Sequence, residues 1–205
     1  MRLVCLSDTH NQHRDIEIPE GDVLIHAGDC TEGGNREETQ DFLDWFSSQP
    51  HTHKILIPGN HDFYFENPEN HKNIPSNIRL LIDQGVEIEQ RLFWGSPYTP
   101  GMDNWAFNRD RGSDIRKHWD LIPPHTDILI THTPPYGILD EIRSGNKLGC
   151  EELTRKLESV EASYHFFGHI HHASGSSIRS KTRFFNLSVL DERSRLMHSP
   201  VVLDI

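Results

Sequence analysis

Histidine and aspartate are the residues of this chain whose types and spacing could do chemistry. The chain holds 15 histidines, dispersed along its length. Asp8 and His10 are separated by one residue, and so are His169 and His171. Alternate side chains of an extended or turning backbone point the same way, so each pair could bind one cation. The spacing therefore predicts metal-ion chemistry.

Polar residues of this kind directly follow five short apolar runs. The runs cover residues 2–7, 22–27, 54–58, 127–131 and 164–167. Continuous apolar runs of this length are typical of strands buried on both faces. The candidate metal ligands that follow them are Asp8, His10, Asp29, Asn60, His132, His169 and His171.

These ligands are carboxylate, amide and imidazole groups, with no thiolate among them. Such a set suits Mn²⁺, Fe or Zn²⁺ better than a soft metal, and Co²⁺ and Ni²⁺ remain alternatives. Seven side chains are too many for one tetrahedral ion. They suit two divalent transition-metal ions, with Mn²⁺ as the first expectation, that share a bridging carboxylate.

Helices alternate with the apolar runs. Asn35 is suited to cap a helix that extends to residue 48, with Glu38 three residues later. Further helices are predicted near 112–120 and 150–160. Strands that alternate with helices predict an α/β or mixed fold, in which the carboxyl ends of parallel strands share one edge. The candidate ligands would meet at that edge.

Two regions depart from this alternation. Near the C-terminus, residues 176–178 and 183–187 read as short strands joined by a turn, which predicts an antiparallel addition. The segment 95–110 is rich in turn residues and aromatics and predicts a long ordered loop.

Length and charge restrict the class of protein. The 205 residues fit a single domain, 1–205. The net charge of −11 disfavours binding to long nucleic acids or anionic lipid, although short nucleic-acid strands remain an alternative partner. The apolar runs fall far short of the ~20 residues of a membrane span, so no membrane association is expected. Three scattered cysteines and the lack of a signal-like start predict a cytoplasmic protein.

The polar blocks resemble, in order, the pattern of the calcineurin-like metallophosphoesterase superfamily: D-x-H, G-D-x-x-[DE], G-N-H-[DE], a lone H, and G-H-x-H. The matching residues are Asp8-x-His10, Gly28-Asp29-x-x-Glu32, Gly59-Asn60-His61-Asp62, His132 and Gly168-His169-x-His171. Stretches such as GDVLIHAGD and WDLIPPHTDILITHTPP resemble its metallophosphoesterase-domain-containing branch. The resemblance implies a four-layer αββα sandwich, with two mixed sheets flanked by helices and the metals at the strand ends.

The resemblance also implies roles for individual residues. The first metal would be held by Asp8, His10, Asp29 and His171. The second would be held by Asp29 as the bridging ligand, Asn60, His132 and His169. His61 would face the phosphate and leaving group, so that Asn60 and His61 contact the substrate. Glu32 would orient His61 and support its positive charge, and Asp62 would have a structural role.

The implied reaction is hydrolysis of a phosphoester by a hydroxide that bridges the metals, with His61 protonating the leaving oxygen. Family phosphatases that act on phosphoproteins carry an arginine after the second acidic residue, whereas Gly33 and Gly34 follow Glu32 here. One fewer positive group favours a diester, so we predict a phosphodiesterase acting on cyclic nucleotides or other nucleotide diesters. A phosphomonoesterase of small phosphate esters and a non-catalytic protein-binding scaffold remain alternatives, and the oligomeric state stays open.

Several aromatic residues could stack a nucleobase near the metals or could belong to the core. They are Phe63, Tyr64, Phe65, Trp94, Tyr98, Trp105 and Phe107. His172, next to His171, and Asn186, on the strand after the last block, are further residues that could reach the site.

Overall fold

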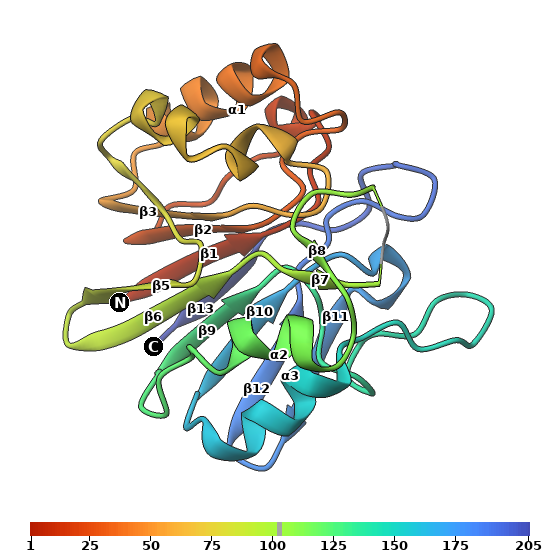
Figure 1. The fold of residues 1–205 in the computed structure, drawn as a ribbon. Helices are drawn as coiled ribbons and strands as arrows, with labels where there is room; N and C mark the ends of the chain where they lie inside the picture. Colours follow the sequence, from red (N-terminus) through yellow and green to blue (C-terminus); the bar gives the residue numbers. More distant parts are fainter. Residues whose placement is uncertain (102–103) are drawn as a thin grey trace.

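Two β-sheets pack face to face, and helices cover their outer faces (Figure 1). The computed structural model describes residues 1–101 and 104–205. Both sheets contain parallel and antiparallel neighbours. The predicted four-layer αββα sandwich of two mixed sheets is therefore confirmed.

The first sheet contains the three N-terminal strands that sequence reasoning predicted. All its neighbouring strands are parallel except β13, which pairs antiparallel with β1. In spatial order the sheet consists of β13 (Val201–Asp204), β1 (Arg2–Leu6), β2 (Val23–Ala27), β3 (His53–Ile57) and β4 (Ile78–Leu80).

The second sheet contains the other two predicted strands, β9 and β10, side by side at its centre. Its two edge strands run antiparallel to their neighbours and the inner pairs are parallel. In spatial order it consists of β11 (Gly175–Arg179), β12 (Thr182–Asn186), β10 (Tyr164–Phe167), β9 (Ile128–Thr131), β6 (Arg91–Ser96) and β5 (Gln84–Ile88).

Helices form the two outer layers. One of them, α1 (Arg36–Ser48), covers the first sheet, while α2 (Ser113–Trp119) and α3 (Glu151–Lys156) cover the second (Figure 1). Short 3₁₀ turns occupy His13–Asp15, Phe63–Glu66, Pro68–Asn73, Leu157–Ser159 and His171–Ala173. Among the described residues, none of the helices is long and apolar enough to cross a membrane.

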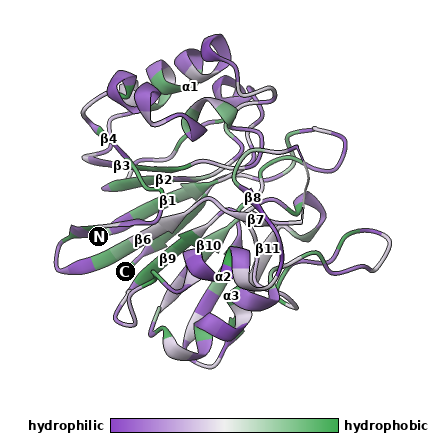
Figure 2. Cartoon of the chain, viewed as in Figure 1, coloured by the Kyte–Doolittle hydropathy of each residue, from purple (hydrophilic) through white to green (hydrophobic). Residues whose placement is uncertain are grey.

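Burial on both faces explains why the predicted strands are continuous apolar runs. In β1, Leu3 and Cys5 join the core between the sheets, whereas Val4 and Leu6 join the core under the helices. Figure 2 shows the resulting contrast between hydrophobic strands and the hydrophilic outer surfaces of the helices. Such strands carry no outward polar face, which places them in the middle layers.

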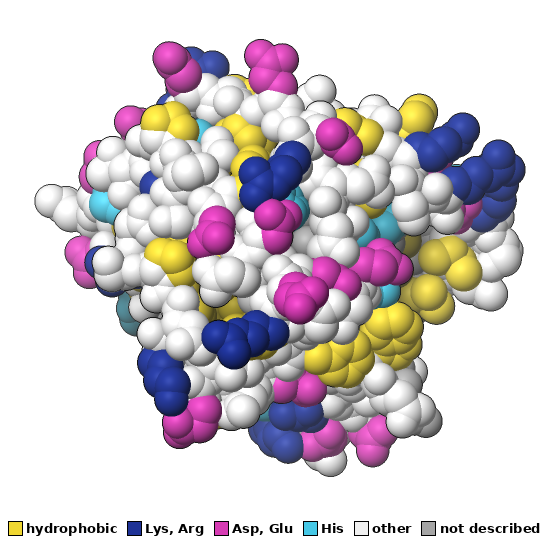
Figure 3. Space-filling model, turned by 90° about the horizontal axis from the view of Figure 1, so that it is seen from above, with side chains coloured by type: hydrophobic (Ala, Val, Ile, Leu, Met, Phe, Trp, Pro, Cys, Tyr) yellow, Lys and Arg dark blue, Asp and Glu magenta, His cyan; other side chains and the backbone are white. Residues whose placement is uncertain are grey.

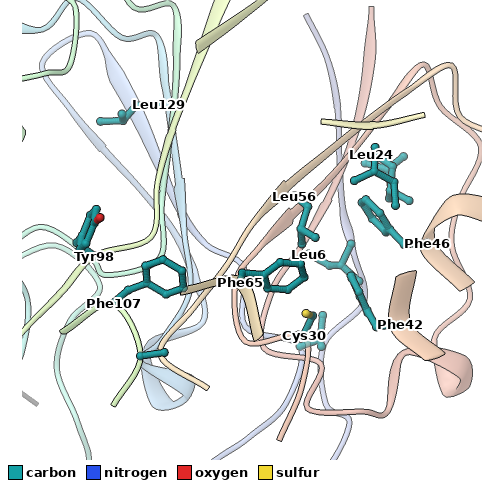
Figure 4. Close-up of a cluster of buried hydrophobic side chains, with 14 of the residues drawn as sticks. Leu6, Leu24, Cys30, Phe42, Phe46, Leu56, Phe65, Tyr98, Phe107 and Leu129 are labelled. Atoms are coloured by element: carbon teal, nitrogen blue, oxygen red, sulfur yellow. The ribbon is translucent and has the colours of Figure 1, made fainter. Parts of the chain in front are cut away.

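The helix α1 begins where the sequence predicted. The Asn35 side chain accepts hydrogen bonds from the main-chain N–H groups of Glu37 and Glu38, at 2.9 and 3.0 Å. Phe42 and Phe46 of this helix point toward Leu6, Leu24 and Leu56 of the sheet (Figure 4). The Glu38 carboxylate accepts from Gly33 N at 2.7 Å and so ties the start of the helix to the loop after β2.

Three expectations need refinement. The helix predicted over 150–160 is α-helical only to Lys156 and then tightens into a 3₁₀ turn. The segment 95–110 is not entirely loop, because β6 ends at Ser96 and β7 (Thr99–Pro100) pairs with β8 (Asn108–Arg109). Residues 102–103 of that segment lie outside the described residues. The strands β4, β5 and β13 are short, lie at the edges of the sheets, and were not predicted.

Two buried histidines should make the fold sensitive to acid. Burial lowers the pKa of His26 and of His165 to about 3. As the pH falls from 7 to 5, the unfolded chain binds protons at these residues and the folded chain does not. The free energy of unfolding should therefore fall by about 2 kcal/mol for each residue, given an ordinary histidine pKa near 6.5.

Urea unfolding at pH 7 and pH 5 measures this effect. The variant His165→Gln keeps a donor for the Thr131 hydroxyl, which His165 contacts at 2.9 Å, and its free energy of unfolding should fall by about 2 kcal/mol less than that of the wild type between pH 7 and pH 5. The exposed His125 provides the control, because His125→Gln should leave the dependence unchanged. An unaltered pH dependence in His165→Gln would show that this histidine is not the acid-sensitive group.

Candidate metal centre

Four of the candidate ligands lie in backbone conformations that side chains rarely adopt. Asp8, Asp29 and His169 have φ values of 57°, 52° and 69°, and His10 has 39°. Left-handed backbone at residues other than glycine costs energy and tends to occur at functional sites. These turns come directly after β1, β2 and β10, and they direct the side chains into one shared space at the strand ends.

The first group of side chains that could hold a cation consists of Asp8, His10 and His171. Their candidate ligand atoms all lie within 4.8 Å of one another. His171 Nδ1 donates to the carbonyl oxygen of Asp191 at 3.1 Å, so its Nε2 faces Asp8 Oδ1 at 3.5 Å. A main-chain acceptor on one ring nitrogen commonly orients a metal-binding histidine.

The second group consists of Asp29, His132 and His169, again within 4.8 Å of one another. His132 Nδ1 donates to the carbonyl oxygen of Ala27 at 2.9 Å. Its Nε2 lies 3.2 Å from Asp29 Oδ2 and 3.0 Å from Asn60 Oδ1. Asn60 is therefore positioned to add an oxygen ligand to this group.

Asp29 stands between the two groups. His10 Nε2, from the first group, lies 3.8 Å from Asp29 Oδ2. Both groups border the same cavity of about 260 Å³. The space-filling view shows histidine side chains beside acidic ones at the surface, with hydrophobic side chains next to them (Figure 3). The seven predicted ligands thus converge, and Asp29 lies between the two groups.

The carboxylates and histidines of the site perturb one another. Burial raises the pKa of Asp8, but the hydrogen bond with His171 and the charges of neighbouring histidines outweigh it and hold the pKa well below its usual range. Burial also raises the pKa of Asp29, and the charge of His132 likewise more than offsets it. Both carboxylates are therefore ionised and ready to bind cations.

The pKa values of the histidines shift in opposite directions. Burial lowers the pKa of His132, but the charge of Asp29 outweighs it, and the pKa rises to about 9. Asp8 raises the pKa of His171 to about 9 against the effect of burial. Burial and the charge of His132 lower the pKa of His169 to about 4. Cations would replace the protons on His132 and His171, since both need the same lone pair.

The donor set fits a pair of divalent cations. Both ring nitrogens of His10 are buried and have no hydrogen-bond partner among the described residues. The Glu32 carboxylate lies 3.1 Å from Nδ1 of His10, in a geometry that does not form a hydrogen bond. Buried polar atoms are rarely left unpaired, so these nitrogens are consistent with cation ligation. The oxygen and imidazole donors suit transition metals of intermediate hardness.

Two residues that sequence reasoning did not place in this role support Asp8. Ser188 Oγ donates to Asp8 Oδ2 at 2.8 Å, and Asn186 Oδ1 in turn accepts from the main-chain N–H of Ser188 at 3.2 Å. Asn186 also donates to the carbonyl oxygen of Ile170 at 2.8 Å, so it orients the site without facing the cavity. A Cβ on Gly168 would overlap Asp8 Oδ2, which explains the glycine. The spacing of Asn186 and Ser188 was the available signal, since alternate residues share a face.

Asp62 joins the loops that follow β2 and β3. Its buried carboxylate accepts from Gly59 N at 2.8 Å, from Thr31 N at 3.0 Å and from the Thr31 hydroxyl at 2.7 Å. The same loop is tied to Asp29, because His61 N donates to Asp29 Oδ1 at 2.8 Å. Asp62 thus holds the loops after β2 and β3 together.

The contact between His61 and Glu32 differs from the expectation. We expected the Glu32 carboxylate to orient His61, but His61 Nδ1 donates to the main-chain carbonyl oxygen of Glu32 at 2.7 Å. The carboxylate instead approaches His10, and its side chain is 63% exposed. His10, Glu32 and His61 form a third group with ligand atoms within 4.8 Å. The carbonyl can orient His61 whatever residue occupies position 32.

Among the aromatic residues, Trp105 and Phe63 lie near His61. The rings of Trp105 and His61 are 4.3 Å apart between centroids, and Phe63 stacks on Trp105 at 6.3 Å. Both aromatic side chains are partly exposed, whereas Phe65 and Phe107 are buried in the core. Tyr98 is buried and stacks on His118. His172 is exposed near Glu192 and belongs to none of the three groups.

Comparisons with known proteins agree with this geometry. The family model described as "Calcineurin-like phosphoesterase" matches residues 1–173. The human protein named metallophosphoesterase domain-containing protein 1 is 37% identical over 230 residues, which cover 100% of this chain and 71% of that protein. The UPF0046 protein K07C11.7 of Caenorhabditis elegans is 36% identical over 220 residues, covering 100% and 75%. These similarities confirm the resemblance found in the sequence.

The fold is also similar to that of a solved structure. The crystal structure of TT1561 of Thermus thermophilus matches with a TM-score of 0.65 over 99% of this chain and 98% of that chain. At 13% identity the likeness concerns the fold alone.

Proposed function

Because the chain belongs to the calcineurin-like phosphoesterase family, we propose that it is a metal-dependent phosphodiesterase that hydrolyses cyclic nucleotides or other nucleotide diesters. The observation that carries the proposal is the meeting of two Asp/His groups in one cavity, with Asp29 between them. Members of the family typically bind two metal ions, and the paired groups match that number.

We assign the metal ligands from this arrangement. The first ion would be held by Asp8, His10, His171 and Asp29, and the second by Asp29, Asn60, His132 and His169. When bound, two divalent cations act as Lewis acids on phosphate oxygens and lower the pKa of water toward neutrality. Mn²⁺ is the proposed ion, and Fe, Zn²⁺, Co²⁺ and Ni²⁺ are the alternatives.

His61 is the proposed general acid. Because its Nδ1 donates to the Glu32 carbonyl oxygen, its Nε2 is left for the substrate. As the oxygen of water forms a bond to phosphorus, the bond from phosphorus to the leaving oxygen breaks, and the leaving oxygen keeps that electron pair. His61 Nε2 transfers its proton to this oxygen, and the attacking water releases one proton, so the total number of protons is unchanged. Asn60 and His61 both line the cavity and would contact the phosphate.

The cavity lining supports a diester. Among the described residues it contains no lysine or arginine, and it includes the acidic Glu32 and Glu192. A monoester dianion would meet one fewer positive group here than in a site with an arginine clamp, whereas a diester carries one charge less. We also propose that residues 1–205 act as one domain, because β13 pairs with β1 and Ser188 supports Asp8.

A substrate panel tests the function. We expect the protein loaded with Mn²⁺ to hydrolyse bis-p-nitrophenyl phosphate and 2′,3′-cyclic nucleotides with a kcat/KM at least about tenfold above that for p-nitrophenyl phosphate. Parallel loading with Fe²⁺, Co²⁺, Ni²⁺ and Zn²⁺ identifies the preferred ion. The reverse ratio would indicate a phosphomonoesterase. A protein that binds no metal and hydrolyses none of these esters would instead support a non-catalytic scaffold.

A further inference from the structure

A second, larger cavity continues from the proposed metal site. It has a volume of about 480 Å³ and shares His169, His171 and Glu192 with the smaller cavity. Its remaining lining is mainly apolar and includes Pro100, Ile142, Leu148, Ile170 and the cationic Arg111. A mostly apolar cavity of this size with few polar groups is typical of a site for a small organic molecule.

The wall of this larger cavity is a preformed part of the fold. Asp140 Oδ2 accepts from Gly137 N at 2.9 Å and from Gly149 N at 3.1 Å, which closes the loop that carries Ile142 and Leu148. Arg111 anchors the end of the same loop, because its guanidinium donates to the carbonyl oxygens of Gly149 and Leu148, at 2.9 and 3.1 Å. Leu148 is nevertheless 40% exposed. A loop that is closed at its base and holds an apolar side chain at a cavity is suited to contact a ligand.

The position of the larger cavity relative to His61 indicates which part of a substrate it would accept. His61 and Asn60 line the smaller cavity and do not line the larger one. The larger cavity leaves the site on the side of His169 and His171. In an in-line displacement the leaving group departs on the side of its proton donor, His61, so the substituent that stays on phosphorus must point elsewhere.

We propose that the larger cavity binds the nucleoside that remains on the phosphate after hydrolysis, with Leu148 as a specificity-determining residue. This inference rests on the proposed function. The bond from phosphorus to the leaving alcohol breaks, and the ester bond to the retained nucleoside stays intact, so the product is a nucleoside monophosphate. The apolar walls would contact the flat base, and the planar guanidinium of Arg111 could stack on it.

Three esters that share the leaving group p-nitrophenol test this assignment. They are methyl p-nitrophenyl phosphate, phenyl p-nitrophenyl phosphate and thymidine 5′-(p-nitrophenyl phosphate). In protein loaded with Mn²⁺, Leu148→Trp should fill part of the larger cavity. We expect kcat/KM for the thymidine ester to fall by about tenfold or more, with a smaller loss for the phenyl ester and a change within about twofold for the methyl ester.

The matched control is Leu121→Trp. Leu121 is also exposed, at 54%, but it lines neither of the two cavities. This variant should hydrolyse all three esters like the wild type, and both variants should retain the metal content of the wild type. Equal losses on the methyl and thymidine esters in Leu148→Trp, or no loss on the thymidine ester, would overturn the assignment.

Calorimetric binding of thymidine 5′-monophosphate and of methyl phosphate separates this inference from the proposed function. Leu148→Trp should lower the affinity for thymidylate by about tenfold and leave the affinity for methyl phosphate unchanged. If the wild type hydrolyses none of the esters, the proposed phosphodiesterase fails, while selective loss of thymidylate binding still supports the nucleoside site. The nucleoside site would be refuted if the wild type bound thymidylate no more tightly than methyl phosphate. It would also be refuted if Leu148→Trp and Leu121→Trp bound thymidylate equally.

Discussion

Replacing Asp29 with asparagine is expected to remove both bound metal and activity. Its Oδ2 faces His132 at 3.2 Å and His10 at 3.8 Å, and in the proposed site this one carboxylate would contact both cations. Asparagine keeps the size but removes the negative charge that two cations need. Because bound metals contribute several kcal/mol to such hydrolysis, turnover should fall about 10³-fold or more.

Metal content measured by mass spectrometry, together with kcat on bis-p-nitrophenyl phosphate, checks this expectation. The control is Asp62→Asn, which alters a buried carboxylate in the adjoining loop. This carboxylate contacts main-chain groups, the Thr31 hydroxyl and the Cys30 thiol but none of the proposed ligand side chains. Asp62→Asn should lower stability more than it lowers metal content. Full occupancy of both ions in Asp29→Asn would be incompatible with a bridging role for Asp29.

Replacing His61 with alanine should separate catalysis from metal binding. His61 lies beside the proposed ligands but contributes its main-chain N–H, not its ring, to Asp29. The variant should therefore keep the metal content of the wild type. Loss of a general acid should lower turnover by ~10²–10⁴-fold when the leaving group is a poor one, such as the alkoxide of a 2′,3′-cyclic nucleotide.

The leaving group provides the decisive comparison for His61. p-Nitrophenolate leaves without a proton, so His61→Ala should lose much less activity on bis-p-nitrophenyl phosphate than on the cyclic nucleotide. Glu32→Ala should have a small effect on both, because the contact to His61 comes from the main-chain carbonyl. Equal losses on both substrates would contradict proton donation, and loss of metals in His61→Ala would contradict its assignment outside the ligand set.

Local sequence was sufficient for β1, β2, β3, β9 and β10 and for the residues that follow them, but not for the inner strand β6. These five strands are buried on both faces, so each appears in the sequence as a continuous apolar run. The edge strand β5 has exposed residues and no such run, and it was not predicted. Its partner β6 is its neighbour in sequence, but the turn between them is formed by Glu89 and Gln90, which are not the glycine or asparagine residues that mark such turns.

The sequence by itself determined the fold class and the set of residues that could bind metals, because burial periodicity and side-chain chemistry are local properties. Tertiary structure decided how those residues are held and what surrounds them. The hydrogen bond from Ser188 to Asp8 spans 180 positions, and His61 uses the Glu32 carbonyl oxygen, not its carboxylate. One wall of the cavity beside His169 is a loop that Arg111 and Asp140 hold closed at its base. Such contacts depend on backbone direction and chain crossings, which residue types and spacing do not specify.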